Sequence, residues 1–247
     1  MIPLKDENPT RNRAVLTVLL ILVNVGVFLL VQPRDGGVEE ERFHFERAAI
    51  PCELTTGRAL TVGEIDRTFL GDDTACHEAG GPTAFPEKGV FLSVLWSMFF
   101  HADWLHLGFN MLFLWIFGNN IEDHMGVVRF AVFYVLAGVA ATATHVALGP
   151  DSTIPMIGAS GAIAGVMGAY LVRFPDAPIR TVFLFFFIFI QDVRAKWLLA
   201  FWFVSQFFIG PNQGVAWAAH VGGFVFGALV ALLFRMRPTP RRMAWRY

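Results

Sequence analysis

The chain contains six apolar runs without Asp, Glu, Lys or Arg, and these runs limit its possible folds more than any other feature. Overall, 55% of the residues are hydrophobic and 16% are charged, whereas soluble domains carry about 25% charged residues. The runs cover Ala14–Val31, Leu105–Ile121, Phe130–Leu148, Ser160–Val172, Trp197–Ile209 and Trp217–Phe234. The sequence therefore predicts an all-α, polytopic membrane protein with six transmembrane helices.

The lengths of the apolar runs set which of them can cross a membrane. A helix needs about 20 residues to cross a hydrocarbon core of about 30 Å, and shorter helices can cross where neighbours bury them. No small-residue cleavage site follows Val31, so we expect the first run to be a retained helix rather than a signal peptide. The ten-residue run Thr181–Ile190 is too short to cross, and we expect an interfacial or re-entrant segment.

The positions of the basic residues predict the orientation of the chain. Three precede the first run, four lie between the fourth and fifth runs, and five follow the sixth. Because basic segments stay on the cytoplasmic side, we expect a protein of the cell membrane with both termini in the cytoplasm. The predicted organisation is a cytoplasmic segment 1–13, a membrane domain 14–234 with an external loop of about 32–100, and a basic cytoplasmic tail 235–247.

The chain has two cysteines, Cys52 and Cys76, and both fall in the external loop. Paired cysteines outside the cytoplasm commonly form a disulfide bond. The sequence therefore favours a bridge between them, and two unpaired thiols are the alternative.

Strongly polar residues inside the apolar runs are few, and they gather near the beginnings of the second, fourth and sixth runs. His106 and Asn110 lie in the second run, Ser160 opens the fourth, and His220 lies near the start of the sixth. Alternate helices cross the membrane in the same direction, so these four residues are expected at a similar depth. Because polar groups are costly in lipid, they are candidates for function.

Glycines follow Ser160 and His220 at helical spacing. Gly161 is followed by glycines four and seven positions later, while His220, Gly223 and Gly227 lie at i, i+3 and i+7 on one helical face. Small residues allow two helix backbones to approach closely. We therefore expect the fourth and sixth helices to pack together, with Ser160 within hydrogen-bond reach of His220.

Ser160 and His220 suit nucleophilic catalysis. A serine attacks only when a base takes its proton, and neutral histidine is such a base. The oxyanion formed by attack on a carbonyl needs donors already in place. The free N–H groups at a helix start can supply them, as can His106 and Asn110, four apart on one face. Each residue alone is more often structural, and only their convergence predicts a catalytic site.

The motifs around these residues resemble those of the rhomboid intramembrane serine proteases, over about residues 12–236. The matching segments are H-A-D-W-L-H-L-G-F-N at His101–Asn110, G-A-S-G at Gly158–Gly161 and A-H-V-G-G-F-V-F-G at Ala219–Gly227. A turn with Glu122 and Gly126 also fits the family. The resemblance implies a six-transmembrane-helix rhomboid fold and an endopeptidase that acts inside the lipid bilayer.

The resemblance also implies a role for each matching residue. Ser160 would be the nucleophile and His220 the general base. The oxyanion hole would consist of His106, Asn110 and the Ser160 N–H. His101 matches the first family histidine. The supporting glycines of the motifs are Gly158, Gly161, Gly223 and Gly227. The implied partners are transmembrane protein substrates, with no nucleic acid, metal or cofactor.

The chain departs from the family pattern at two places. The Trp-Arg pair that often precedes the first histidine is replaced by Leu92-Ser93, which affects the packing of that loop. Some members carry a Tyr one turn after the serine, stacked on the catalytic histidine, whereas this chain has Ala164. Another group must therefore orient His220.

Two other functions remain as alternatives. A rhomboid-fold protein can bind transmembrane helices without cutting them, and loss of the serine or histidine would mark that case. A six-helix transporter or metal-binding protein could use His101, His106 and His220. However, a spacing of five between His101 and His106 is poor for one helical face, and no H-E-x-x-H motif is present. The sequence favours the protease.

Overall fold

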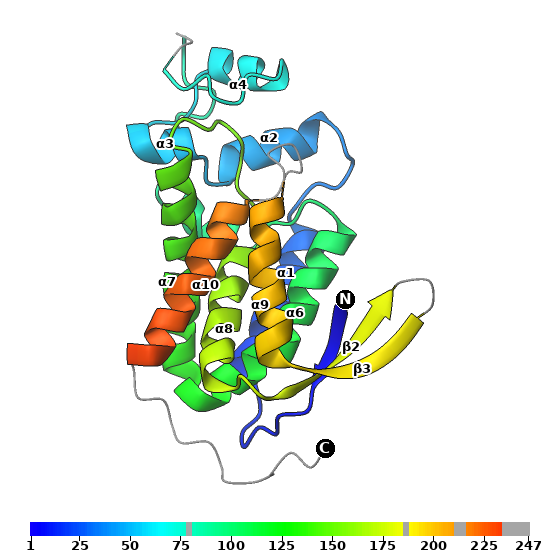
Figure 1. The fold of residues 1–247 in the computed structure, drawn as a ribbon. Helices are drawn as coiled ribbons and strands as arrows, with labels where there is room; N and C mark the ends of the chain where they lie inside the picture. Colours follow the sequence, from blue (N-terminus) through cyan, green and yellow to red (C-terminus); the bar gives the residue numbers. More distant parts are fainter. Residues whose placement is uncertain (78–80, 185–187, 210–215, 234–247) are drawn as a thin grey trace.

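The computed structural model describes residues 1–77, 81–184, 188–209 and 216–233. In Figure 1, a bundle of long helices carries short helices at one end and a small sheet near the other. The long helices are α1 (Val15–Leu30), α6 (Trp104–Met125), α7 (Val127–Leu148), α8 (Ser160–Arg173), α9 (Ala195–Ser205) and α10 (Trp217–Leu233). Each corresponds to one of the predicted apolar runs. The predicted tail 235–247 lies outside the described residues.

Helix α8 occupies the centre of the bundle. It contacts α6, α7, α9 and α10, and every residue from 162 to 170 is buried. The closest approach is to α10, where the carbonyl oxygens of Gly161 and Gly165 lie against Gly223 and Gly227 and leave no room for a Cβ atom. The helix contact that the glycine spacing predicted is therefore present in the structure.

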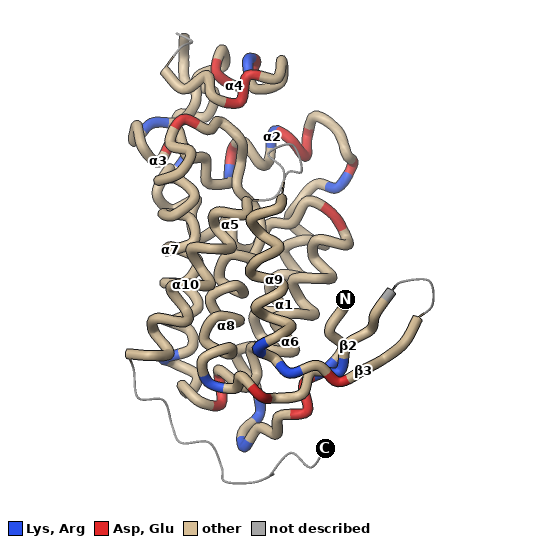
Figure 2. Tube along the Cα trace, in the orientation of Figure 1, with Lys and Arg blue, Asp and Glu red and all other residues tan. Residues whose placement is uncertain are grey.

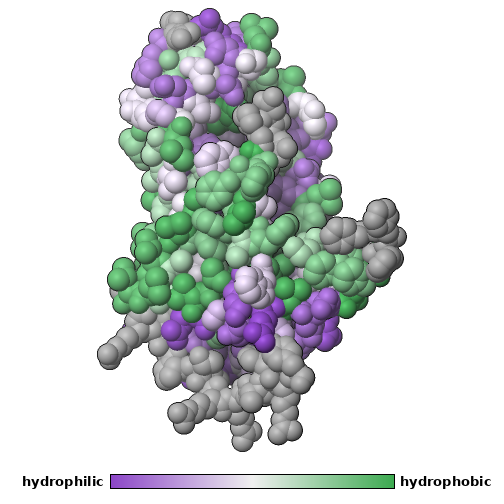
Figure 3. Space-filling view, in the orientation of Figure 1, coloured by the Kyte–Doolittle hydropathy of each residue, from purple (hydrophilic) through white to green (hydrophobic). Residues whose placement is uncertain are grey.

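The middle of the bundle is apolar on its outer surface as well as inside. Figure 2 shows the charged residues gathered toward the two ends of the molecule, and Figure 3 shows a hydrophobic band between polar ends. Exposed side chains such as Leu22, Trp115 and Val225 contribute to this apolar surface. Among the described helices, α7 alone is long and apolar enough to cross a bilayer by itself, while α1 and α10 are apolar but shorter, at 16 and 17 residues.

A three-stranded antiparallel sheet shows that the prediction of an all-α protein is wrong. Its strands, in the order β1-β2-β3, are β1 (Ile2–Asp6), β2 (Pro178–Leu184) and β3 (Ile188–Arg194). Thr181 lies opposite Pro3 in β1 and Gln191 in β3. Of the run Thr181–Ile190, the described residues 181–184 and 188–190 thus belong to two paired strands, a structure that the expectation of an interfacial or re-entrant segment did not include. Its β-branched and aromatic residues favour strands, and ten apolar residues are too few for periodicity to decide.

Two buried carboxylates tie the N-terminal segment to the bundle. The Glu122 carboxylate accepts hydrogen bonds of 2.8 Å from the backbone N–H groups of Leu16 and Thr17, which are free donors in the first turn of α1. At the end of β1, Asp6 accepts a hydrogen bond of 2.9 Å from the Tyr170 hydroxyl on α8. The N-terminal segment is therefore part of the folded domain.

Between α1 and α6, the chain forms a cap over one end of the bundle. Its helices are α2 (Val38–Arg47), α3 (Pro51–Thr56), α4 (Val62–Phe69) and α5 (Ser93–Ser97). Cys52 and Cys76 form a disulfide bond, so the bridge is present rather than two thiols. The buried side chains of Lys88 and Glu53 form an ion pair of 2.5 Å. The predicted external loop is therefore a small folded unit, which we call the cap.

The cap holds the segment that leads into α8. The Cys52 N–H donates to the Ser152 carbonyl at 2.9 Å, and the Met156 N–H donates to the Ala49 carbonyl at 2.7 Å. The Ser97 hydroxyl accepts a hydrogen bond of 2.6 Å from the Ala49 N–H. Backbone contacts around the disulfide therefore fix a loop that ends at the start of the central helix.

The disulfide is expected to stabilise the cap measurably. Its cysteines are 24 residues apart, and closing a loop of this length contributes about 3 kcal/mol to the free energy of unfolding. The double variant Cys52→Ser/Cys76→Ser should lose about that much in a chemical unfolding experiment. Reductant should destabilise the wild-type protein and leave the double variant unchanged. Equal stability of the two proteins would show that the bridge contributes nothing.

Candidate active site

Ser160 and His220 lie together where α8 and α10 begin. Ser160 is the first residue of α8, and His220 lies in the first turn of α10. The Ser160 Oγ and the His220 Nε2 are 2.8 Å apart, which is a hydrogen-bond distance. The packing of two glycine-lined helices thus brings together a hydroxyl and an imidazole from distant parts of the chain.

The backbone ahead of Ser160 has a conformation that favours glycine. Gly158 has a φ of +119°, in a region that residues with a Cβ atom rarely adopt. Its N–H donates to the Ser97 carbonyl at 2.9 Å. A Cβ atom at Gly158 would lie 2.8 Å from the His106 Nε2, so glycine also makes room for that imidazole. The segment before the serine is therefore fixed from both α5 and α6.

His106 directs a ring nitrogen toward the start of α8. Its Nδ1 accepts a hydrogen bond of 3.3 Å from the Ala102 N–H. A neutral imidazole that accepts at Nδ1 carries its proton on Nε2. The Nε2 atom lies beside Gly158, two residues before Ser160. His106 is therefore placed to donate a hydrogen bond near the serine.

His101 is fully buried and is held through its backbone. Its N–H donates to the Gln32 side-chain oxygen at 3.0 Å, and its carbonyl accepts a hydrogen bond of 2.5 Å from the Gln32 Nε2. The His101 ring packs edge-on against the His106 ring, with centroids 5.0 Å apart. Its position therefore supports His106, and neither of its ring nitrogens has a hydrogen-bond partner among the described residues.

Asn110 lies one turn after His106 on the same face of α6. Its side-chain Nδ2 donates to the His106 carbonyl at 2.8 Å. Its Oδ1 is buried and has no hydrogen-bond partner within the described residues. In this conformation the amide group bonds within its own helix, so a role as an oxyanion donor requires the side chain to turn.

Two residues near the end of α9 contact His220, and neither was predicted from the sequence. The Gln206 Oε1 lies 2.8 Å from the His220 Nδ1, and the Trp202 ring centroid lies 5.8 Å from that of the imidazole. Gln206 is the one strongly polar side chain, apart from a serine, in the uncharged run Trp197–Ile209, and that signal could have identified it. These two residues supply contacts to His220 that Ala164 cannot.

A group of three possible metal ligands lies in and beside the cap, away from the serine. The ligand atoms of Cys76, His77 and Asp151 fall within 4.8 Å of one another. The Cys76 sulfur, however, is bonded to Cys52 and cannot act as a thiolate ligand. This group is therefore better explained by the disulfide than by a metal site.

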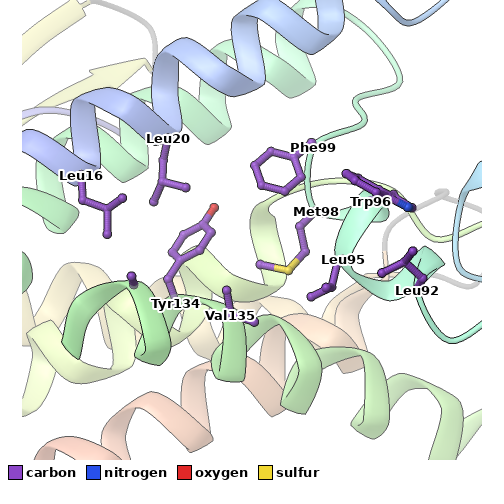
Figure 4. A pocket seen from close by; sticks show the side chains of 10 residues that line it. Leu16, Leu20, Leu92, Leu95, Trp96, Met98, Phe99, Tyr134 and Val135 are labelled. Atoms are coloured by element: carbon purple, nitrogen blue, oxygen red, sulfur yellow. The ribbon is translucent and has the colours of Figure 1, made fainter. Parts of the chain in front are cut away.

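An apolar cavity of about 270 Å³ lies between α1, α5 and α7. Figure 4 shows Leu20, Phe99 and Tyr134 among the side chains around it. Neither a serine nor a histidine belongs to its lining. The cavity is therefore separate from the Ser160–His220 pair, which lies between α8 and α10.

The region with the serine–histidine pair matches a known protein family. The Rhomboid domain matches residues 88–237, which is more than half of the chain and includes both Ser160 and His220. The chain belongs to the rhomboid family. The Rhomboid domain implies a polytopic helical membrane fold, and this rhomboid is therefore a membrane protein with several spanning helices.

Curated relatives of this rhomboid come from eukaryotes and from a bacterium. Rhomboid protein 1, mitochondrial, of Saccharomyces cerevisiae is 31% identical over 56% of this chain and 40% of its own length. The presenilin-associated rhomboid-like protein, mitochondrial, of Bos taurus is 32% identical over 59% of this chain and 39% of its own length. Rhomboid protease AarA of Providencia stuartii is 28% identical over 60% of this chain and 57% of its own length. The chain thus spans about two-fifths of the length of the yeast and bovine relatives.

The relatives overturn the predicted location in the cell membrane with cytoplasmic termini. The yeast and bovine relatives are both named as mitochondrial proteins. The apolar runs indicate that the helices lie in a lipid bilayer, and the flanking charges indicate which side each end faces. Proteins of different membranes share both features. The sequence of a rhomboid span therefore could not have distinguished a cell membrane from a mitochondrial one.

Proposed function

We propose that this rhomboid is an intramembrane serine endopeptidase that cleaves peptide bonds in or near transmembrane segments of other membrane proteins. The observation that carries the proposal is the distance of 2.8 Å between the Ser160 Oγ and the His220 Nε2. A protein that only binds helices has no need of a hydroxyl paired with a base. The relative from Providencia stuartii is named a rhomboid protease, which supports the same function.

The proposed reaction begins with attack of the Ser160 Oγ on the carbonyl carbon of the scissile peptide. His220 takes the hydroxyl proton on Nε2 and then gives it to the nitrogen of the leaving amine. The first product leaves, and the other part of the substrate remains bonded to Ser160 as an ester. His220 then takes a proton from a water molecule, which attacks the ester carbonyl. The bond from this carbon to the Ser160 Oγ breaks, His220 returns the proton to the Oγ, and the second product leaves as a carboxylic acid.

The proposed oxyanion hole lies at the start of α8. Ser160 is the first residue of a helix, where backbone N–H groups have no intrahelical partner and the helix dipole favours negative charge. The His106 Nε2, beside Gly158, is the side-chain donor nearest in position. Asn110 becomes a second donor if its amide turns away from the His106 carbonyl. Donors already in place stabilise the negative charge of the tetrahedral intermediate more strongly than they stabilise the neutral carbonyl of the bound substrate.

The length of α8 explains how a serine can act inside the membrane. Its 14 residues span about 21 Å, which is less than the hydrocarbon core of about 30 Å. If its far end reaches the membrane surface, then Ser160 lies below the opposite surface. The loop held by the cap enters the membrane domain from that side, and it gives water a short route to the site.

The proposed organisation follows from the same helices. The membrane domain would be 14–234, and the helices that cross the membrane would be α1, α6, α7, α8, α9 and α10. The segment 1–13 would precede this domain and the tail 235–247 would follow it. The loop of about 32–100 would connect α1 to α6. The mitochondrial names of two relatives favour a mitochondrial membrane. Transmembrane proteins of that membrane would then be the substrates.

Labelling with a fluorophosphonate tests the proposed function. This probe reacts only with a serine that a neighbouring base activates, so purified protein in lipid vesicles should bind it at Ser160. Mass spectrometry of the labelled peptide identifies the site. The same preparation should cleave a single-span test substrate. Protein that binds the substrate but neither cleaves it nor reacts with the probe would favour a helix-binding function.

A further inference from the structure

The side chain of Gln206 is held in one orientation by two hydrogen-bond acceptors. Its amide lies 3.0 Å from the Trp202 carbonyl oxygen and 3.3 Å from the Ser205 Oγ. The Ser205 hydroxyl donates its own proton to the Trp202 carbonyl at 2.6 Å, so its oxygen faces Gln206 as an acceptor. The amide atom between these two groups must therefore be the nitrogen, because an oxygen there would face two acceptors.

This orientation determines which ring nitrogen of His220 carries the proton. With the Gln206 nitrogen bonded to Trp202, the Gln206 oxygen faces the His220 Nδ1 at 2.8 Å. An amide oxygen only accepts hydrogen bonds, so the Nδ1 must be the donor. A neutral imidazole with its proton on Nδ1 has a free lone pair on Nε2. That lone pair faces the Ser160 Oγ at 2.8 Å.

We propose that Gln206 is a positioning residue, which fixes the His220 tautomer and ring so that Nε2 can accept the proton of Ser160. The inference rests on the proposed function and adds a third residue to the proposed pair. Gln206 would hydrogen-bond to the ring nitrogen of His220 that does not face Ser160. The Trp202 ring, tilted by 39° against the imidazole, packs beside the same histidine. Gln206 is itself buried, so water competes little for its bond to His220.

Substitutions of Gln206 distinguish a role in positioning the His220 ring from a role in filling space beside it. Gln206→Leu keeps most of the buried volume and removes the acceptor, and we expect kcat for a single-span test substrate to fall about tenfold, as for the loss of one orienting hydrogen bond. The value of KM should stay the same, because Gln206 contributes to the reacting geometry rather than to binding. Gln206→Glu retains an acceptor oxygen and should restore the rate to within about threefold of wild type.

Nitrogen NMR of histidine-labelled protein reads the tautomer directly and needs no substrate. The His220 signals can be assigned by their loss in His220→Ala. In the wild-type protein and in Gln206→Glu, the Nδ1 should carry the proton. In Gln206→Leu, we expect a mixture of the two tautomers. A residue that only fills space would not change this signature.

Gln191→Leu is the matched control. It makes the same substitution at an exposed position of β3, away from His220, so the rate and the tautomer should match those of the wild type. The proposal is overturned if Gln206→Leu keeps both the wild-type kcat and the Nδ1-protonated tautomer, or if Gln206→Glu shows no recovery of either. Failure of the proposed function is seen separately, because wild-type protein would then not cleave at all while NMR still reports the tautomer.

Discussion

Ser160→Ala is expected to abolish cleavage of a transmembrane substrate while the protein stays folded. The change removes one hydroxyl and keeps the small side chain that starts α8, so the packing of α8 on α10 remains. Loss of the proposed nucleophile should lower kcat on the order of 10⁴-fold or more, and the fluorophosphonate should no longer react. Cleavage in lipid vesicles and thermal unfolding of the same sample measure activity and folding together.

His220→Ala should produce a loss of similar size, and the double variant should lose little more. In the proposed mechanism the two residues act as one unit through their hydrogen bond of 2.8 Å, so the effects of the two substitutions should not add. Ser152→Ala is a suitable control, because this serine lies in the loop before α8 and, within the described part of the chain, its hydroxyl accepts only a long bond of 3.4 Å from the Ile154 N–H. If folded Ser160→Ala protein cleaves at the wild-type rate, then Ser160 is not the nucleophile.

Gly227→Ala is expected to disrupt the bundle although it adds a single methyl group. A Cβ atom there would overlap the carbonyl oxygen of Gly165 on α8, and a backbone group cannot move aside as a flexible side chain can. Overpacking of this kind should lower the free energy of unfolding by about 3 kcal/mol. Cleavage should also be lost, because α10 carries His220 and would move away from Ser160.

Gly26→Ala provides the matched control for this prediction. Gly26 also lies in an apolar helix, α1, but a Cβ atom at this position would meet nothing within 4 Å. Alanine is a better helix former than glycine by roughly 0.5–1 kcal/mol, so this variant should be as stable as the wild type or slightly more stable. Equal unfolding transitions and rates for both variants would show that α8 and α10 do not need their close contact.

The sequence was sufficient to predict the helices and the serine–histidine pair. The apolar runs are long and uncharged, and the energetic cost of charge in lipid makes that pattern specific for membrane helices. The glycines at helical spacing after Ser160 and His220 predicted which two helices approach closely. Because alternate helices run in the same direction, residues near their starts lie at the same level, and the structure places this pair at a hydrogen-bond distance.

The sequence could not decide the fold of the segment after α8. The run Thr181–Ile190 is apolar from Val182 onward, so its pattern suits a buried helix, an interfacial segment or a strand equally well. In the structure this segment pairs with β1, whose residues lie more than 170 positions earlier in the chain. Pairing across such a separation depends on how the whole bundle places the N-terminal segment, and no local propensity encodes it.

The sequence by itself therefore determined a helical membrane protein, the pairing of Ser160 with His220 and the glycine contact that joins their helices. Only the tertiary structure decided which other residues contact His220 and hold the loop before Ser160. Gln206 meets His220 because α9 ends beside the start of α10, and the cap holds the loop before Ser160 through backbone hydrogen bonds. Helical periodicity tells which residues share a face of one helix, whereas partners from other helices and loops follow from the packing of the complete chain.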